Sequence, residues 1–206
     1  MSVIELPADH LEADLVAPPG APGIVLFAHG TGSSRHSPRN RAVAEVLNRH
    51  GIGTLLMDLL TPTEAEAHRF DLPLLTGRLL AAIDWVEHHE YTHRMKIGLF
   101  GSSTGAAAAL RAAAARPWTV RAVVSRGGRP DLAESVLDMV SAPTLLVVGQ
   151  HDPEVMHANE QAQAALGGPS ELRVVLEAGH LFTEHGAMNR VCELSTAWFR
   201  DHLRKN

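Results

Sequence analysis

Short apolar runs alternate with helical segments along almost the whole chain, and this alternation limits the possible folds more than any other feature. Strand-like runs rich in leucine, valine and isoleucine occupy residues 24–28, 54–57, 97–100, 120–124, 144–148 and 172–176. Helices are predicted over residues 38–50, 72–90, 106–115, 131–140, 154–166 and 188–203. This alternation indicates a mostly parallel sheet covered by helices on both faces. The length of 206 residues predicts one α/β domain, residues 1–206.

The segment 11–17 has a different pattern from the other strands. Its apolar residues Leu11, Ala13 and Leu15 alternate with the acidic residues Glu12 and Asp14. Alternation of this kind is typical of a strand with one face in water. We therefore expect a half-exposed strand at an edge of the sheet.

Composition excludes several classes of protein. The formal net charge is −5, so the chain has no general basic field for nucleic acid. The single cysteine, Cys192, rules out an internal disulfide and suits a reducing compartment. No apolar run reaches membrane-spanning length, and the first ten residues lack the pattern of a signal peptide. We expect a cytoplasmic protein without a nucleic-acid or membrane partner, and oligomeric state is not readable from the sequence.

Residues 101–105, Gly-Ser-Ser-Thr-Gly, fit the nucleophile-elbow pattern G-x-S-x-G. The pattern requires a strand, a sharp turn and a helix, and the predicted strand 97–100 and helix 106–115 supply that context. Gly101 and Gly105 flank Ser103 at the two positions that must be small, whereas Ser102 lacks this frame. The sequence thus predicts Ser103 as the nucleophile.

A serine nucleophile needs a base, and the base needs an orienting acid. Asp152 follows the predicted strand 144–148, and His180 follows the predicted strand 172–176. Taken singly, Asp152 could cap the helix that begins near Pro153, and His180 could be an ordinary loop histidine. Ser103, Asp152 and His180 nevertheless occur at successive carboxyl edges in the order expected for an α/β hydrolase, which favours a catalytic triad.

The loop after the strand 24–28 reads His29-Gly30-Thr31-Gly32, which matches the glycine-rich oxyanion loop of esterases. One oxyanion donor is expected to be the backbone N–H of Thr104, the residue after the nucleophile. We place the second at the N–H of Thr31, with Gly30 and Gly32 as alternatives.

A second catalytic pattern precedes the elbow. Residues 89–93 fit H-E-x-x-H, a zinc-peptidase signature that works only when both histidines lie on one helix. The helix containing His89 must end before the strand near residue 97, so His93 is expected in a turn at the edge of the sheet away from the site. We expect no metal site here.

The chain resembles the α/β hydrolases of the dienelactone-hydrolase-like group over nearly its whole length, through residues 29–32 and 101–105, Asp152 and His180. The resemblance implies an eight-stranded, mostly parallel sheet with an antiparallel second strand. It also implies hydrolysis of small esters or lactones through an acyl-enzyme, without metal or cofactor. Dienelactone hydrolase proper uses a cysteine where this chain has Ser103, so a serine esterase is the better expectation. An idle scaffold used for binding, an acyltransferase and, least favoured, a zinc peptidase are the alternatives.

Basic residues at carboxyl edges of the strands are candidates for holding an anionic part of the substrate. They are Arg35, Arg39, Arg41, Arg126 and Arg129. The alternative is that these arginines form ion pairs with acids such as Asp58 and Asp131.

Other residues near these edges are candidates for walls of the substrate pocket. They are Gly30, Gly32, Leu59, Leu60, Leu181 and Phe182. The segment 125–142 is too short for a large lid, so an open site is expected.

Overall fold

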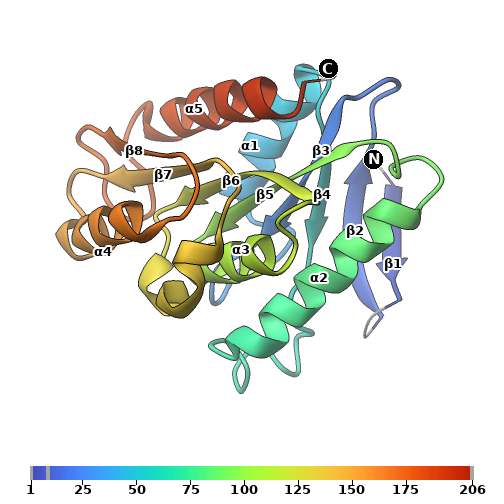
Figure 1. Cartoon of the computed structure of the whole chain (residues 1–206), viewed down its shortest axis with the longest axis horizontal. Helices are drawn as coiled ribbons and strands as arrows, with labels where there is room; N and C mark the ends of the chain where they lie inside the picture. Colours follow the sequence, from blue (N-terminus) through green and yellow to red (C-terminus); the bar gives the residue numbers. More distant parts are fainter. Residues whose placement is uncertain (1, 8–9, 205–206) are drawn as a thin grey trace.

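An eight-stranded sheet forms the centre of the computed structural model, which describes residues 2–7 and 10–204 (Figure 1). The strands are β1 (Ser2–Leu6), β2 (Leu11–Val16), β3 (Gly23–Ala28), β4 (Gly53–Met57), β5 (Lys96–Ser102), β6 (Val120–Arg126), β7 (Thr144–Gly149) and β8 (Ser170–Val175). Their order in the sheet is β1-β2-β4-β3-β5-β6-β7-β8. Residues 1, 8, 9, 205 and 206 of the predicted domain lie outside the described residues.

Strand β2 runs antiparallel to both of its neighbours, and the pairs from β4 to β8 are parallel. The predicted eight-stranded sheet with an antiparallel second strand is therefore confirmed. The prediction that residues 11–17 form an edge strand is wrong, because β1 covers the outer side of β2. Asp14 in β2 is also buried, since two arginines contact its carboxylate.

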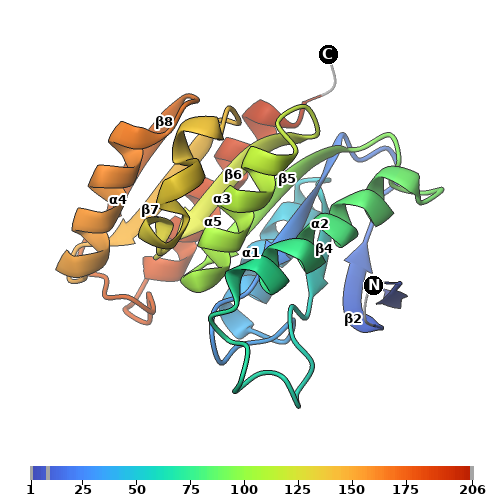
Figure 2. The same cartoon turned by 60° about the horizontal axis from the view of Figure 1, so that its bottom comes forward.

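Helices cover both faces of the sheet, as the alternation of strands and helices predicts (Figures 1 and 2). The helices are α1 (Pro38–Arg49), α2 (Leu72–His88), α3 (Thr104–Ala115), α4 (Pro153–Ala165) and α5 (Ala187–His202). Helices α1 and α5 pack on one face, while α2, α3 and α4 pack on the other. Residues 130–139 form a 3-10 helix, η1 (Pro130–Met139), where an ordinary helix over 131–140 was expected.

Helix ends follow local sequence. Ser37 caps α1, because its Oγ accepts a hydrogen bond from the N–H of Asn40 at 3.4 Å. Helix α2 is capped by Asp71 and ends at His88, two residues before the predicted end. No helix among residues 2–7 and 10–204 is long and apolar enough to cross a membrane.

Helix α3 lies unusually close to the sheet, and small residues make this possible. A Cβ added to Gly105 would lie 2.2 Å from the carbonyl oxygen of Ala28, which real Cβ atoms do not do. A Cβ on Gly101 would lie 2.4 Å from the Cα of Ala106. The two glycines of the elbow are thus required by the approach of α3 to β3 and β5. This contact fixes the start of α3, and with it residue 103, at the carboxyl edge of the sheet.

Candidate active site

Ser103 occupies the sharp turn between β5 and α3. Its φ of 50° lies in the left-handed region, which is uncommon for a residue other than glycine and marks a strained turn. Ser103 is partly exposed, whereas its neighbour Ser102 is only 3% exposed and belongs to β5. Of the two serines, only Ser103 is placed to meet a substrate.

Asp152 and His180 come from different loops and meet at the same edge of the sheet. Asp152 follows β7, and His180 lies five residues after the end of β8. Their side chains are joined by a contact of 2.6 Å between His180 Nδ1 and Asp152 Oδ2. Asp152 holds the N-cap position of α4 but makes no side-chain cap bond, so its carboxylate serves the histidine and not the helix.

The backbone at residues 126–127 brings Ser103 and His180 to the same place. The N–H of Ser103 donates to the carbonyl oxygen of Arg126 at 3.3 Å. On the next residue, a Cβ added to Gly127 would lie 3.6 Å from His180 Cε1. The nucleophile candidate and the histidine therefore flank one short stretch at the end of β6.

The predicted oxyanion loop lies directly against Ser103. A Cβ on Gly30 would lie 2.9 Å from Ser103 Cβ, so only glycine allows this approach. The N–H of Thr31 donates to Thr104 Oγ1 at 3.0 Å. The N–H of Thr104, at the first position of α3, has no hydrogen-bond partner among the described residues. Thr104 thus presents a free amide, while its hydroxyl engages the amide expected to be the second donor.

His29 holds the base of this loop, a role that the sequence reasoning did not assign to it. Its Nε2 accepts a hydrogen bond from the N–H of Leu59 at 2.9 Å, and its Nδ1 lies 3.0 Å from the carbonyl oxygen of Gly30. These partners fix the tautomer with the proton on Nδ1. Burial lowers the pKa of His29, which favours the same neutral ring. The imidazole therefore ties the oxyanion loop to the end of β4.

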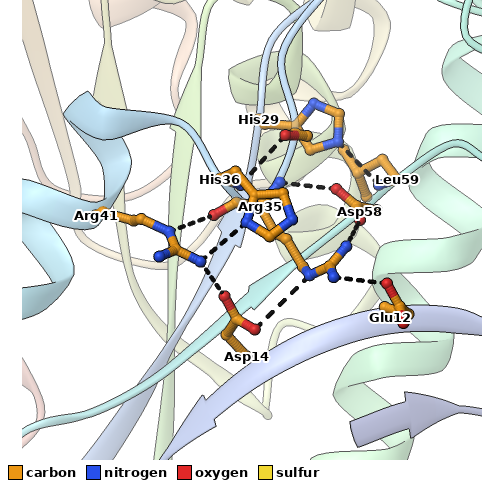
Figure 3. A network of polar contacts seen from close by, with 9 residues as sticks. Glu12, Asp14, His29, Arg35, His36, Arg41, Asp58 and Leu59 are labelled. Atoms are coloured by element: carbon orange, nitrogen blue, oxygen red, sulfur yellow. Dashed lines mark hydrogen bonds and ion pairs between the residues drawn. The ribbon is translucent and has the colours of Figure 1, made fainter. Parts of the chain in front are cut away.

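Arg35 anchors the far end of the loop through a network of ion pairs (Figure 3). Its guanidinium pairs with Asp58 and, at 2.6 Å, with Glu12, and its own N–H donates to Asp58 at 2.7 Å. Asp14 lies 2.6 Å from Arg41 and 3.7 Å from Arg35. Arg35 is therefore paired with carboxylates of the chain itself, as expected if this arginine forms ion pairs and does not hold a substrate anion.

The segment between β4 and α2 forms the other wall beside the oxyanion loop. Arg78 donates to both carboxylate oxygens of Glu64 at 2.9 Å and to the carbonyl oxygen of Leu59 at 2.8 Å. The bonds from Arg78, followed by those from the N–H and hydroxyl of Thr61, lower the pKa of Glu64 to about 2. Leu60 and Arg69 from this segment line a small hollow together with residues 29–33 and Thr104. We call the paired hydrogen bonds between Arg78 and Glu64 the clamp. The two residues are far apart in the sequence, so no local sequence signal predicts their contact.

The remaining predicted wall residues differ in exposure. Leu59 is fully buried in the core, and Leu181 is 50% exposed. Phe182 is 1% exposed, and the guanidinium of Arg126 lies 5.8 Å from the centre of its ring. Arg129 forms an ion pair with Asp131, which was the alternative to its holding a substrate anion.

The H-E-x-x-H stretch lies outside any helix, as expected. Helix α2 ends at His88, His89 is its cap, and residues 90–94 form turns. The ring of His89 stacks on Trp85 with centroids 4.2 Å apart. The part of the chain that the structure describes contains no group of three or more histidine, cysteine or acidic residues that could hold a metal ion.

Comparison with known proteins decides the family. The model of the dienelactone hydrolase family matches residues 11–200. The chain belongs to the dienelactone hydrolase family. It shares the fold of the α/β hydrolases, and membership in this family supports hydrolase activity.

A crystal structure of dienelactone hydrolase from Anabaena variabilis is 52% identical, with a TM-score of 0.94, and the match covers 98% of this chain and 97% of that one. Est1E from Butyrivibrio proteoclasticus is 18% identical with a TM-score of 0.85, over 100% of both chains, which shows the shared fold.

Among curated proteins, one from Mycobacterium tuberculosis, provisionally named a phosphoribosyl transferase, is 53% identical over 191 residues. The match covers 92% of this chain and 43% of that protein, so the chain spans less than half the length of this relative.

Proposed function

We propose that this chain is a serine hydrolase that cleaves small esters or lactones through an acyl-enzyme on Ser103. The observation that carries the proposal is the contact of 2.6 Å between His180 and Asp152, at the edge where the elbow presents Ser103. The family match and the likeness to the Anabaena dienelactone hydrolase support the same class of substrate.

In the proposed reaction, His180 Nε2 takes the proton of the Ser103 hydroxyl as Oγ attacks the carbonyl carbon. Asp152 holds the ring through Nδ1 and stabilises the imidazolium that forms. His180 then protonates the leaving alcohol oxygen, and the acyl group stays on Ser103. In the second half, His180 removes a proton from water, the hydroxide attacks the acyl carbon, and Ser103 regains its proton.

The oxyanion is proposed to accept hydrogen bonds from the N–H groups of Thr104 and Thr31. The Thr104 amide is already free, whereas the Thr31 amide is engaged by the Thr104 hydroxyl. Rotation of the Thr104 side chain about χ1 moves Oγ1 away from the Thr31 N–H and frees this donor when the carbonyl oxygen arrives. Both donors sit on anchored backbone, which is the arrangement that stabilises a tetrahedral intermediate.

Labelling with a fluorophosphonate probe tests the proposal. We expect the wild type and Ser102→Ala to be labelled and Ser103→Ala to remain unlabelled, because only Ser103 lies in the elbow. Hydrolysis of a short-chain 4-nitrophenyl ester should follow the same pattern. Labelling that survives in Ser103→Ala would contradict the assignment of the nucleophile. An unlabelled wild type would favour the idle scaffold used for binding.

The name of the mycobacterial relative does not lead us to propose a transferase activity. The match covers under half of that protein, so its name can describe the part of that protein that does not align with this chain. The single cysteine supports a reducing compartment, and we propose that the chain works in the cytoplasm.

A further inference from the structure

Strand β8 forms the edge of the sheet opposite β1, and among the described residues it pairs with β7 alone (Figure 1). Its residues Glu171, Arg173 and Val174 are exposed. A strand at an edge presents N–H and C=O groups with which another strand can pair, unless something covers them. The outer side of β8 is therefore a surface suited to a further strand.

The direction of the backbone groups in β8 follows from its bonds to β7. Just before β8, the carbonyl oxygen of Pro169 accepts a hydrogen bond from the N–H of Thr144 at 2.9 Å. At the end of β8, the carbonyl oxygen of Val175 accepts one from the N–H of Gln150 at 3.0 Å. Successive residues direct their backbone groups to opposite sides of a strand, so the odd-numbered residues of β8 bond to β7. The even-numbered residues direct their N–H and C=O groups outward.

These outward groups are largely free. Among the described residues, no hydrogen bond outside the sheet engages the backbone of Leu172 or Val174. The backbone of Ser170 engages Gln163, whose Nε2 donates to the Ser170 carbonyl oxygen at the long distance of 3.4 Å. The outer side of β8 can therefore form a ladder of hydrogen bonds with one more strand.

The side chains of this edge decide which strand fits. Glu171 and Arg173 lie on one face of β8, flank Leu172 and form an exposed ion pair at 2.6 Å. When two β8 strands pair antiparallel about Leu172, Glu171 of each copy faces Arg173 of the other. Each charge then meets an opposite charge across the pair, so the edge is complementary to itself.

Backbone and charge select the same register. A pair centred on Leu172 sets the outward-directed, even-numbered residues opposite one another, as a hydrogen-bonded ladder requires. Glu171 and Arg173 then fall at the positions between them, where opposite side chains lie closest. A pair centred on Glu171 or Arg173 would instead set like charges opposite each other, which is destabilising.

The opposite face of β8 adds apolar contact. Leu172 is half-buried, and Val174 is 42% exposed. In the register centred on Leu172, this side chain meets its own copy, and Val174 lies diagonally beside it. Association would therefore remove apolar surface from water.

Strand β1, at the other edge, lacks such a pattern. Its only charged residue is Glu5, so two β1 strands cannot set opposite charges against each other. Pairing of β8 with β1 of another copy would be head-to-tail, and such contacts do not close into a pair. A closed pair is therefore favoured at β8.

We propose that two copies of this chain form a twofold dimer by antiparallel pairing of their β8 strands about Leu172, which makes one continuous sheet. Charged side chains on an edge strand keep unrelated strands away, whereas the opposite charges of Glu171 and Arg173 admit a strand of the same pattern. Each β8 strand has 6 residues, so the interface is smaller than the roughly 1,600 Å² typical of stable complexes, and the dimer should be reversible. This inference goes beyond the proposed function and does not depend on it.

Sedimentation velocity at protein concentrations from about 5 to 500 μM tests the dimer, because a small interface corresponds to a Kd in this range. We expect the wild type to pass from monomer to dimer. Glu171→Arg and Arg173→Glu should each remain monomeric, because like charges then face each other. An equimolar mixture of these two variants should dimerise, since each residue meets an opposite charge in the other variant. The variant with both changes should dimerise as the wild type does.

Glu45→Arg is the matched control, because Glu45 is exposed on α1, which packs against β4. It should dimerise as the wild type does, and a thermal melt should show that every variant is folded. A wild type that stays monomeric at all concentrations would overturn the proposal, and the charges would then only protect the edge. A dimer that neither charge variant weakens, or a mixture of the two that stays monomeric, would also overturn it. Species larger than a dimer would indicate head-to-tail pairing and contradict the twofold dimer.

Disulfide cross-linking tests the register. Across the twofold axis, the Cα atoms of the two copies of residue 172 should lie about 5.5 Å apart, within the range of a disulfide. Leu172→Cys should therefore cross-link to its copy under mild oxidation, whereas Cys192 is buried and should not react. Val174→Cys should stay free, because the two copies of residue 174 would lie roughly 14 Å apart along the ladder. Failure to cross-link at residue 172, or cross-linking at residue 174, would contradict the proposed pairing.

Discussion

At the scale of single residues, the site depends on how one carboxylate is used. Asp152 stands where helix α4 needs a cap, yet its oxygen contacts His180 Nδ1. We expect Asp152→Asn to fold normally and to lose about 10²- to 10⁴-fold in kcat, because an amide can favour the wrong tautomer of the histidine. Ester hydrolysis together with a thermal melt checks both parts.

Asp84→Asn is the control for that experiment, since Asp84 pairs with Arg116 toward the C-terminal ends of α2 and α3, whereas Ser103 lies at the N-terminal end of α3. Its kcat should match the wild type. If Asp152→Asn kept wild-type kcat, the proposed role of the Asp152 carboxylate would be wrong.

Sequence reasoning selects Ser103, Asp152 and His180 as candidates for a triad because each follows a strand in a fixed order. The order of residues gives no distances, so the hydrogen bond between the Thr31 amide and the Thr104 hydroxyl could not be predicted. The ion-pair partners of the arginines could not be predicted either. Arg35 and Arg126 look alike in sequence, and only the fold gives carboxylates to the first and none to the second.

At the scale of elements, the loop between β4 and α2 depends on the clamp between Arg78 and Glu64. Glu64→Gln removes the charge that Arg78 holds, and we expect residues 61–70 to open more often. Trypsin should then cleave faster after the exposed Arg69. Glu66→Gln changes an exposed acid in the same loop and should leave the cleavage rate unchanged. Equal rates in all three proteins would show that the clamp does not hold the loop.

The same clamp has a defined pH dependence. Hydrogen bonds from Arg78, and after them from Thr61, lower the pKa of Glu64 from 4.5 to about 2, so the folded state prefers the ionised carboxyl. Its contribution to stability is complete above the ordinary pKa and is lost as the pH falls from 4.5 toward 2. Amide exchange of residues 61–70, corrected for intrinsic rates, should therefore begin to lose protection below about pH 4.5 in the wild type and show less of this change in Glu64→Gln.

The bounds of the strands were easier to predict from the sequence than the neighbours of each strand in the sheet. Continuous apolar runs located β3 to β7 to within two residues, because burial on both faces leaves a strong signal. Strand β1 was missed, since it is short and mostly exposed and so lacks such a run. Because β1 was not predicted, the segment 11–17 was interpreted as the edge strand of the sheet.

At the scale of the whole molecule, α3 is a tightly packed element. It lies between the sheet and the neighbouring helices, and ten of its twelve residues are buried. We expect Ala109→Leu to destabilise the fold by about 1–3 kcal/mol, because extra methyl groups in a packed core force strain. Ala115→Leu adds the same atoms at an exposed position of α3 and should change little. Denaturant titration compares them, and equal midpoints would contradict tight packing around α3.

The proposed catalytic residues all lie at the carboxyl edge of the sheet, while the turn at residues 89–95 lies at the opposite edge. The chain also has one thiol, Cys192, which is 6% exposed and whose pKa is raised by burial. A cysteine introduced at the exposed Tyr91 would therefore be the reactive thiol of the molecule. Attached to a surface or a dye through that position, the protein would present its active edge to the solution in a single orientation.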